Sequence, residues 1–171
     1  SKRIKGFINV DILPLENVDI RHDLTKSPYP FENESIDEIL MTEVLEHISF
    51  KDTDKVLAEC YRILKSGGKM HIQVPDCGSM MEAYVFNGID KRIPHKPISE
   101  DHALEAIIET GKVVHPDRWL YAFCGAGKHQ YDFHKNIFTK EKMEEYLERA
   151  GFKVDFKDDP KRWKIIVNAI K

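Results

Sequence analysis

The sequence predicts an α/β fold, in which helices cover a mostly parallel sheet that ends in an antiparallel C-terminal pair. Three observations support this prediction. Short apolar runs typical of strands alternate with segments of helical periodicity, which favours a parallel sheet. The strand candidate at residues 36–41 is mostly apolar, as a parallel strand buried on both faces should be. The last two strand candidates are joined by the short segment 157–162, which favours antiparallel pairing.

Three strand candidates occupy the N-terminal part of the chain. The first covers residues 7–11, where β-favouring side chains lead to an acid, Asp11. The second covers 17–24 and ends near another acid, Asp23. The third is the apolar run 36–41, which follows a proline-rich loop. The two acids are candidates for a binding site, because ligands of open α/β sheets bind at the carboxyl ends of the strands.

The clearest helix covers residues 53–65, and we expect Gly67 and Gly68 to stop it. Its apolar side chains recur on one face: Val56, Leu57, Cys60, Ile63 and Leu64. A strand at 69–74 follows. An irregular, aromatic and histidine-rich insertion at about 78–136 then interrupts the alternation.

Order returns after the insertion. A helix is predicted at 139–150, with Gly151 as its stop, and strands are predicted at 152–157 and 163–170. The helix buries Met143, Tyr146, Leu147 and Ala150. We therefore expect residues 1–171 to form a single domain.

The composition is that of an ordinary soluble protein. Lys and Arg number 26 against 29 Asp and Glu, a net charge of −3, so nothing points to nucleic acid or to an anionic membrane. No apolar run approaches the length of a membrane span. Three cysteines at unrelated spacings make no disulfide framework, which suits reduced thiols in the cytoplasm.

Several segments, in this order and spacing, resemble the class I S-adenosylmethionine-dependent methyltransferases, and in particular small members of the "type 11" kind. The segments are "FINVDI", "VDIRHDL", "PYPFENESIDEILMTEVLEHI", "VLAECYRILKSGGKMHIQVPD" and "FTKEKMEEYLERAGF". The resemblance covers about two thirds of the chain. It implies a Rossmann-like three-layer sandwich, S-adenosylmethionine as cofactor, and methyl transfer to a small acceptor, for which a sugar or lipid-linked glycan is one candidate.

The resemblance also implies which residues bind the cofactor. These are Asp11, Ile12, Asp23, Leu24, Thr42 and Glu43. Asp11 corresponds to the acid that accepts hydrogen bonds from both ribose hydroxyls, and a carboxylate suits this diol because two acceptor oxygens meet two donors. Asp23 corresponds to the acid that takes the adenine amino group, and the Leu24 N–H can meet a ring nitrogen. A solvated loop acid at Asp11 and a turn-forming role for Asp23 are the alternatives.

Two histidines are the catalytic candidates. In similar methyltransferases the insertion covers the acceptor pocket, and an acceptor hydroxyl benefits from a base. His134 is the proposed base, with Asp132 or His47 behind it. The alternative for His47, in "LEHI", is a structural histidine whose hydrogen bonds are satisfied.

One family feature is absent. In the family, the first strand and its Gly-x-Gly loop would come directly before residue 1. This strand lies in the sheet between the strands that correspond to 7–11 and 36–41, so we expect these two strands to lack their shared neighbour. An altered sheet or a homodimer is therefore expected, because buried strand edges need partners. Cofactor binding is expected to be weak. The alternative function is a shortened domain that acts as a binding or self-associating module.

Two other patterns compete with this interpretation. Tyr131 and Lys135 fit the Tyr-x-x-x-Lys pair of short-chain dehydrogenases, but that pair needs a helix and this segment is a poor one. Cys124, His129 and His134 are evenly spaced, which is no structural zinc pattern, so no metal site is predicted.

Overall fold

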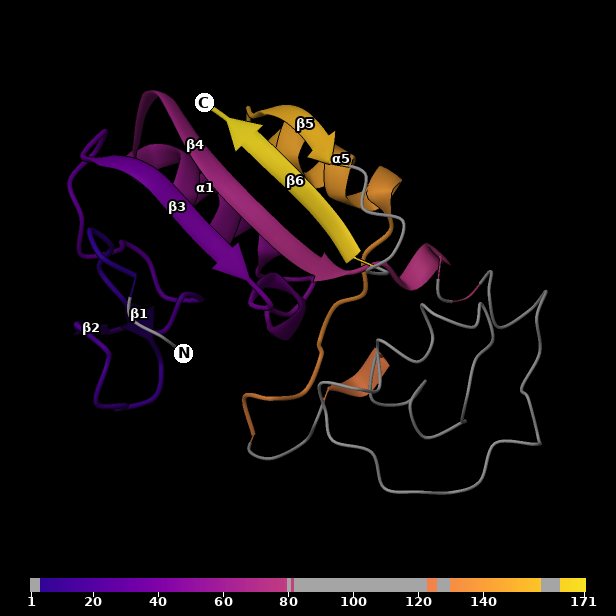
Figure 1. The fold of residues 1–171 in the computed structure, drawn as a ribbon, viewed down its shortest axis with the longest axis horizontal. Coiled ribbons are helices and arrows are strands. Elements are labelled where there is room, and N and C mark those ends of the chain that lie inside the picture. The colour runs from indigo at the N-terminus through magenta and orange to yellow at the C-terminus, as the bar shows by residue number, and fades with distance from the viewer. Residues whose placement is uncertain (1–3, 80, 82–122, 126–129, 158–163) are drawn as a thin grey trace.

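A computed structural model describes residues 4–79, 81, 123–125, 130–157 and 164–171. Figure 1 shows a twisted main sheet with two helices behind it. The elements are β1 (Val10–Asp11), β2 (Ile20–Arg21), β3 (Ile36–Thr42), the 3-10 helix η1 (Leu45–His47), α1 (Thr53–Ile63), β4 (Leu64–Pro75), α5 (Lys140–Arg149), β5 (Lys153–Lys157) and β6 (Lys164–Ile170).

The main sheet has the strand order β3-β4-β6-β5. β3 and β4 run parallel, and β6 pairs antiparallel with both β4 and β5. α1 and α5 lie behind this sheet in Figure 1. The prediction of an α/β, Rossmann-like fold with an antiparallel C-terminal strand is confirmed.

The core lies between the sheet and these two helices. The predicted apolar face of α1 is buried, and Leu57 and Val56 are fully enclosed. α5 contributes Met143 and Leu147, and its N-cap Thr139 accepts a hydrogen bond from the Lys142 N–H, which satisfies one free donor of the first turn. Every second residue of β6 is buried, as one covered sheet face requires.

α1 ends earlier than predicted. Leu64 already has extended backbone and begins β4. The carbonyls of Arg62 and Ile63 accept hydrogen bonds from the N–H groups of Glu34 and Ser35, so the loop before β3 ends the helix. Gly67, with φ of 76°, lies within β4, and the prediction that the glycines stop the helix is wrong.

The N-terminal strands form a sheet of their own. β1 and β2 pair in parallel, each over two residues, which is shorter than the predicted runs 7–11 and 17–24. Within the described residues no strand pairs with the outer edge of β3, and β1 does not pair with it either. Among the described residues, strand pairing therefore does not join the two sheets.

Most of the insertion at 78–136 lies outside the described residues, so its predicted place over the acceptor site stays a prediction. The three cysteines are free thiols. Among the described residues, no helix combines the length and apolar character that crossing a bilayer requires.

Candidate functional site

Asp11 and Asp23 follow neighbouring parallel strands at the same edge of the small sheet. Asp11 is paired with Arg21, and the His22 N–H donates to the Asp11 carbonyl at 2.9 Å. The Asp11 side chain is half-buried, and its Oδ1 accepts a hydrogen bond from the Leu13 N–H at 2.8 Å. This bond fixes the carboxylate at the carboxyl end of β1, where ligands of open sheets bind.

The Asp23 side chain closes a turn. Its Oδ1 accepts hydrogen bonds from the N–H of Thr25 at 2.9 Å and from the hydroxyl of Thr25 at 2.8 Å. Burial alone would raise the pKa of Asp23, but these hydrogen bonds and the charges of Lys26 and His22 lower it. The carboxylate is therefore ionised at neutral pH. Asp23 thus has the predicted turn-forming role through Oδ1, and its other oxygen, Oδ2, is the one that a ligand could use.

Thr42 and Glu43 lie at the end of β3, in the other sheet. Glu43 has a positive φ of 53°. Its Oε1 receives a hydrogen bond from Gln73 Nε2 at 3.2 Å and pairs with Lys164 Nζ at 3.1 Å. No hydrogen bond or ion pair among the described residues connects Thr42 or Glu43 with Asp11 or Asp23. The six predicted cofactor residues thus form two groups that the protein itself does not join.

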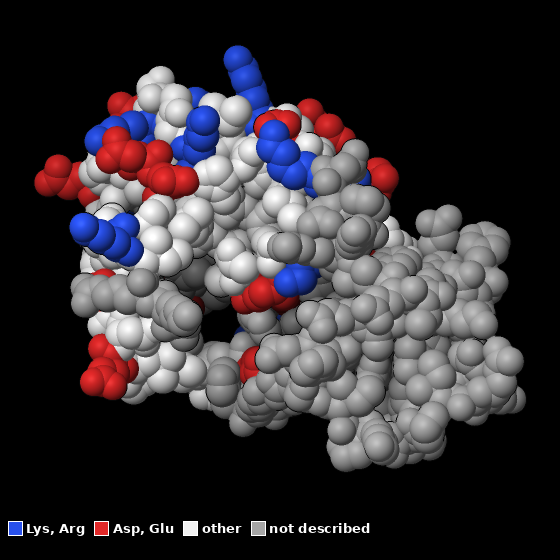
Figure 2. All heavy atoms as spheres, viewed as in Figure 1, with Lys and Arg blue, Asp and Glu red and all other residues white. Residues whose placement is uncertain are grey.

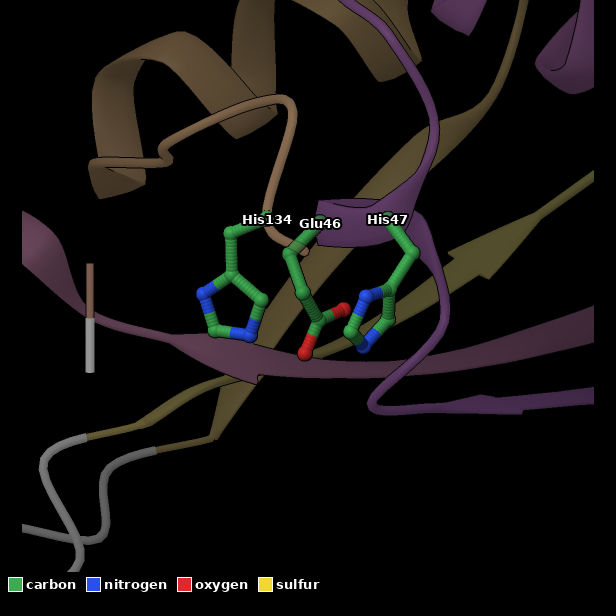
Figure 3. A group of neighbouring side chains, drawn as sticks. All are labelled: Glu46, His47 and His134. Atoms are coloured by element: carbon green, nitrogen blue, oxygen red, sulfur yellow. The ribbon is translucent and has the colours of Figure 1, made fainter. Parts of the chain in front are cut away.

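His47 and His134 lie side by side, although they are far apart in the sequence. Their ring centroids are 4.9 Å apart, with an edge-to-face angle of 77°. Figure 3 shows the Glu46 carboxylate between the two imidazoles. One potential ligand atom from each of Glu46, His47 and His134 lies within 4.8 Å of the others. The structure therefore brings together the two predicted catalytic histidines and adds a carboxylate.

Backbone hydrogen bonds hold the two segments of this cluster together. The Glu46 carbonyl accepts from the N–H groups of Lys135 at 2.8 Å and Asn136 at 3.1 Å. The buried side chain of Asn136 donates to Thr53 Oγ1 at 3.0 Å and accepts from Lys142 Nζ at 2.6 Å. η1, α1 and α5 are thus tied to the segment that carries His134.

Glu46 is the residue that the sequence analysis missed. It is 1% exposed, and no described N–H or O–H group donates to either of its carboxylate oxygens. Burial, followed by the negative charge of Glu43, raises the pKa of Glu46 to about 8. Burial and the Glu43 charge therefore favour the protonated form of Glu46 when no cation is present. The sequence signal that could have indicated Glu46 is a second Glu between the apolar residues of "EVLEHI".

The protonation of His47 follows from its neighbour. Its Nδ1 lies 3.3 Å from the Phe133 carbonyl oxygen, which can only accept a hydrogen bond. Nδ1 therefore carries the proton, and in the neutral ring Nε2 keeps its lone pair. His47 has a structural contact and, at the same time, an available ring nitrogen.

The competing patterns fare differently. Residues 131–135 form a turn and irregular backbone, so Tyr131 and Lys135 do not lie on one face of a helix. His129 lies outside the described residues, so the spacing with Cys124 is not tested. Asp132, the alternative partner of His134, is half-buried in the same turn.

Known proteins resemble this chain in part of its sequence and in its fold. Residues 9–72 match the family described as "Methyltransferase domain". A 70-residue stretch is 39% identical to an uncharacterized protein of Methanocaldococcus jannaschii, covering 41% of this chain and 29% of that protein. The chain spans less than a third of this curated relative.

Solved structures agree with this match. A SAM-dependent methyltransferase from Archaeoglobus fulgidus superposes with a TM-score of 0.55 at 14% identity, over 96% of this chain and 75% of that one. One from Thermotoga maritima gives a TM-score of 0.50 at 17% identity, over 91% and 65%. Residues 9–72 thus resemble a methyltransferase domain in sequence, and the chain shares its fold with solved SAM-dependent methyltransferases.

Proposed function

We propose that the chain transfers a methyl group from S-adenosylmethionine to a small acceptor, such as the hydroxyl of a sugar. The observation that carries this proposal is the pair of carboxylates, Asp11 and Asp23, at the ends of two adjacent parallel strands. The family match at residues 9–72 covers both strands. These two carboxylates would contribute to binding of the cofactor.

The carboxylates would bind the nucleoside part of the cofactor. Asp11 Oδ1 already accepts from Leu13, and its Oδ2 accepts no hydrogen bond from a described residue, so the ribose diol can be bound there. Asp23 would accept from the adenine amino group, with the Leu24 N–H at a ring nitrogen. Ile12 would contact the same part of the cofactor, and Thr42 and Glu43 would contact it from β3.

Methyl transfer is a direct displacement. The acceptor oxygen forms a bond to the methyl carbon as the bond from that carbon to the sulfonium breaks, and S-adenosylhomocysteine leaves with the electron pair. The base receives the hydroxyl proton. His134 would take this role beside His47, and alignment of the two reactants supplies most of the rate. The proposed partner is a small molecule in the cytoplasm, with no role for nucleic acid or membrane.

A second candidate function rests on a different observation. Among the described residues, β3 and β1 have no strand partner on their facing edges. Such edges are places where another chain can add a strand. The second candidate is a methyltransferase-like domain that binds cofactor poorly and self-associates, with a homodimer as the expected assembly.

Calorimetry and sedimentation distinguish these candidates. The 171-residue chain is titrated with S-adenosylhomocysteine, and its mass is measured at the same concentration. Micromolar binding by a monomer supports the enzyme and contradicts the second candidate. A dimer that does not bind the nucleoside supports the second candidate. Adding labelled S-adenosylmethionine and a panel of sugars to a binding-competent chain then tests the acceptor class.

A further inference from the structure

We infer that Glu46, His47 and His134 form a binding site for one divalent transition-metal ion. The inference goes beyond methyl transfer and does not depend on it. Two independent observations carry it. One is the convergence of a carboxylate and two imidazoles, whose potential ligand atoms lie within 4.8 Å of one another. The other is the buried Glu46 carboxylate, which receives no hydrogen bond from a described residue.

The spacing of the three groups fits a metal ion after a small adjustment. Zinc binds imidazole nitrogens and carboxylate oxygens at about 2.0–2.2 Å, so ligand atoms on one ion are about 3.4 Å apart. The observed limit of 4.8 Å is closed by side-chain rotations, because His47 and His134 are only half-buried. Figure 3 shows that the three side chains already converge, with the carboxylate in the middle.

The surroundings hold the ligands in place. The Phe133 carbonyl accepts a hydrogen bond from the Nδ1–H of His47, and this is the second contact that metal-bound histidines usually make. The Glu46 carbonyl binds the N–H groups of Lys135 and Asn136, which fixes the chain next to His134. Two segments that are distant in the sequence are therefore held close enough for side-chain rotations to bring their ligand atoms onto one ion.

The local charges also favour a cation. Lys164 pairs with Glu43 at 3.1 Å, so these two neighbours nearly cancel. Of the three side chains in the cluster, Glu46 is the one that can carry a negative charge. A buried ionised carboxylate is costly unless it is paired or binds a metal, and a divalent ion supplies that partner.

The ligand set selects the class of metal. Two imidazoles and one carboxylate suit zinc, cobalt or iron(II), and leave coordination positions for water or a ligand oxygen. Magnesium and calcium prefer oxygen ligands throughout. A bound ion would act as a Lewis acid on an acceptor hydroxyl, and His134 would then be a ligand in place of a base.

Cobalt(II) is the probe for the test, because its visible spectrum reports coordination. The chain is treated with EDTA, passed over a desalting column, and titrated with cobalt(II) and, by calorimetry, with zinc. One ion per chain is expected, and excess zinc but not excess magnesium should remove the cobalt spectrum. Absence of one-to-one binding, or displacement of cobalt by magnesium, would overturn the inference.

Three variants locate the site. His134→Ala and Glu46→Gln should each weaken cobalt binding by about tenfold or more, the scale on which even outer contacts matter. His71→Gln is the matched control, because His71 also contacts a carboxylate, Glu38, but lies outside the cluster. Its affinity should stay within about twofold. Circular dichroism checks that the variants are folded, and wild-type affinity in a folded His134→Ala would contradict the site.

Discussion

The stability of the protein depends on a partly buried ion pair on α1, and replacing Glu59 with Gln tests this. The Glu59 carboxylate accepts hydrogen bonds from Arg62 Nε and Nη2, both at 2.9 Å, and from the Tyr29 N–H at 2.7 Å. Its side chain is 14% exposed. Arg62 in turn donates to the carbonyl of Phe31 at 3.0 Å, so the pair attaches the loop before β3 to the helix.

The expected loss follows from these contacts. Hydrogen bonds to a charged group are worth about 1.5–3 kcal/mol each. The glutamine keeps one acceptor oxygen, so we expect Glu59→Gln to lower the free energy of unfolding by about 2–3 kcal/mol at pH 7. For a domain of this size, each kcal/mol shifts the melting temperature by about 2–4 °C. Urea denaturation followed by circular dichroism measures the difference.

The loss should depend on pH. The Arg62 hydrogen bonds lower the pKa of Glu59 below its ordinary value of 4.5, although burial opposes them. A carboxyl with a lower pKa in the folded state contributes stability that is complete above the unfolded pKa and disappears as the pH falls through the folded one. The difference between wild type and Glu59→Gln should therefore be constant near neutral pH and shrink in acid below about pH 4.5.

Glu145→Gln is the control. Glu145 forms a similar pair with Arg149 at 3.2 Å on α5, but its side chain is 73% exposed. Exposed helix pairs of this kind are worth about 0.3–0.5 kcal/mol. Equal losses for the two variants, or a Glu59→Gln loss that does not shrink in acid, would refute the role assigned to burial and to the Arg62 contact.

Three further predictions concern single residues. Asp11→Ala should weaken S-adenosylhomocysteine binding by about 1.5–3 kcal/mol in calorimetry, with Asp11→Asn less affected; equal binding by wild type and Asp11→Ala would exclude the ribose role. Gly151→Ala should cost about 1–2 kcal/mol of stability, because φ is +96° and the new Cβ would lie 3.1 Å from Tyr61; an unchanged melting temperature contradicts this. Asn136→Ala should cost about 1–3 kcal/mol of stability, because it removes the hydrogen bonds that the buried Asn136 side chain makes with Thr53 and Lys142; an unchanged melting temperature contradicts this.

Local sequence patterns predicted most of the main sheet and both helices. The helix at 139–150 and the strand at 163–170 agree with α5 and β6 within a residue at each end, because periodicity and capping act locally. The end of α1 was wrong for a tertiary reason. The N–H groups of Glu34 and Ser35 donate hydrogen bonds to the last carbonyls of the helix, and the sequence of α1 itself does not indicate these contacts.

The candidate site was predictable only in part. His47 and His134 could be named from their segments, but their contact depends on hydrogen bonds from Lys135 and Asn136 to the Glu46 carbonyl. Burial of Glu46 is also a property of the fold, since Glu is usually exposed. A sequence shows residue types and spacing, but whether a carboxylate is isolated from donors depends on segments that are distant in the chain.

The two halves of the site differ in how they are held. The proposed cofactor residues are divided between two sheets, because β1, which ends at Asp11, does not pair with β3, which precedes Glu43, in the described residues. Glu46, His47 and His134 are instead fixed by backbone hydrogen bonds within the main body. Ordering the two sheets around a ligand would cost conformational free energy. Metal binding at Glu46, His47 and His134 does not require this ordering. Metal binding should therefore persist in a chain whose cofactor affinity is low, and a cobalt titration repeated on Asp11→Ala should give the wild-type affinity. Loss of cobalt binding in this variant would show that the two halves are coupled.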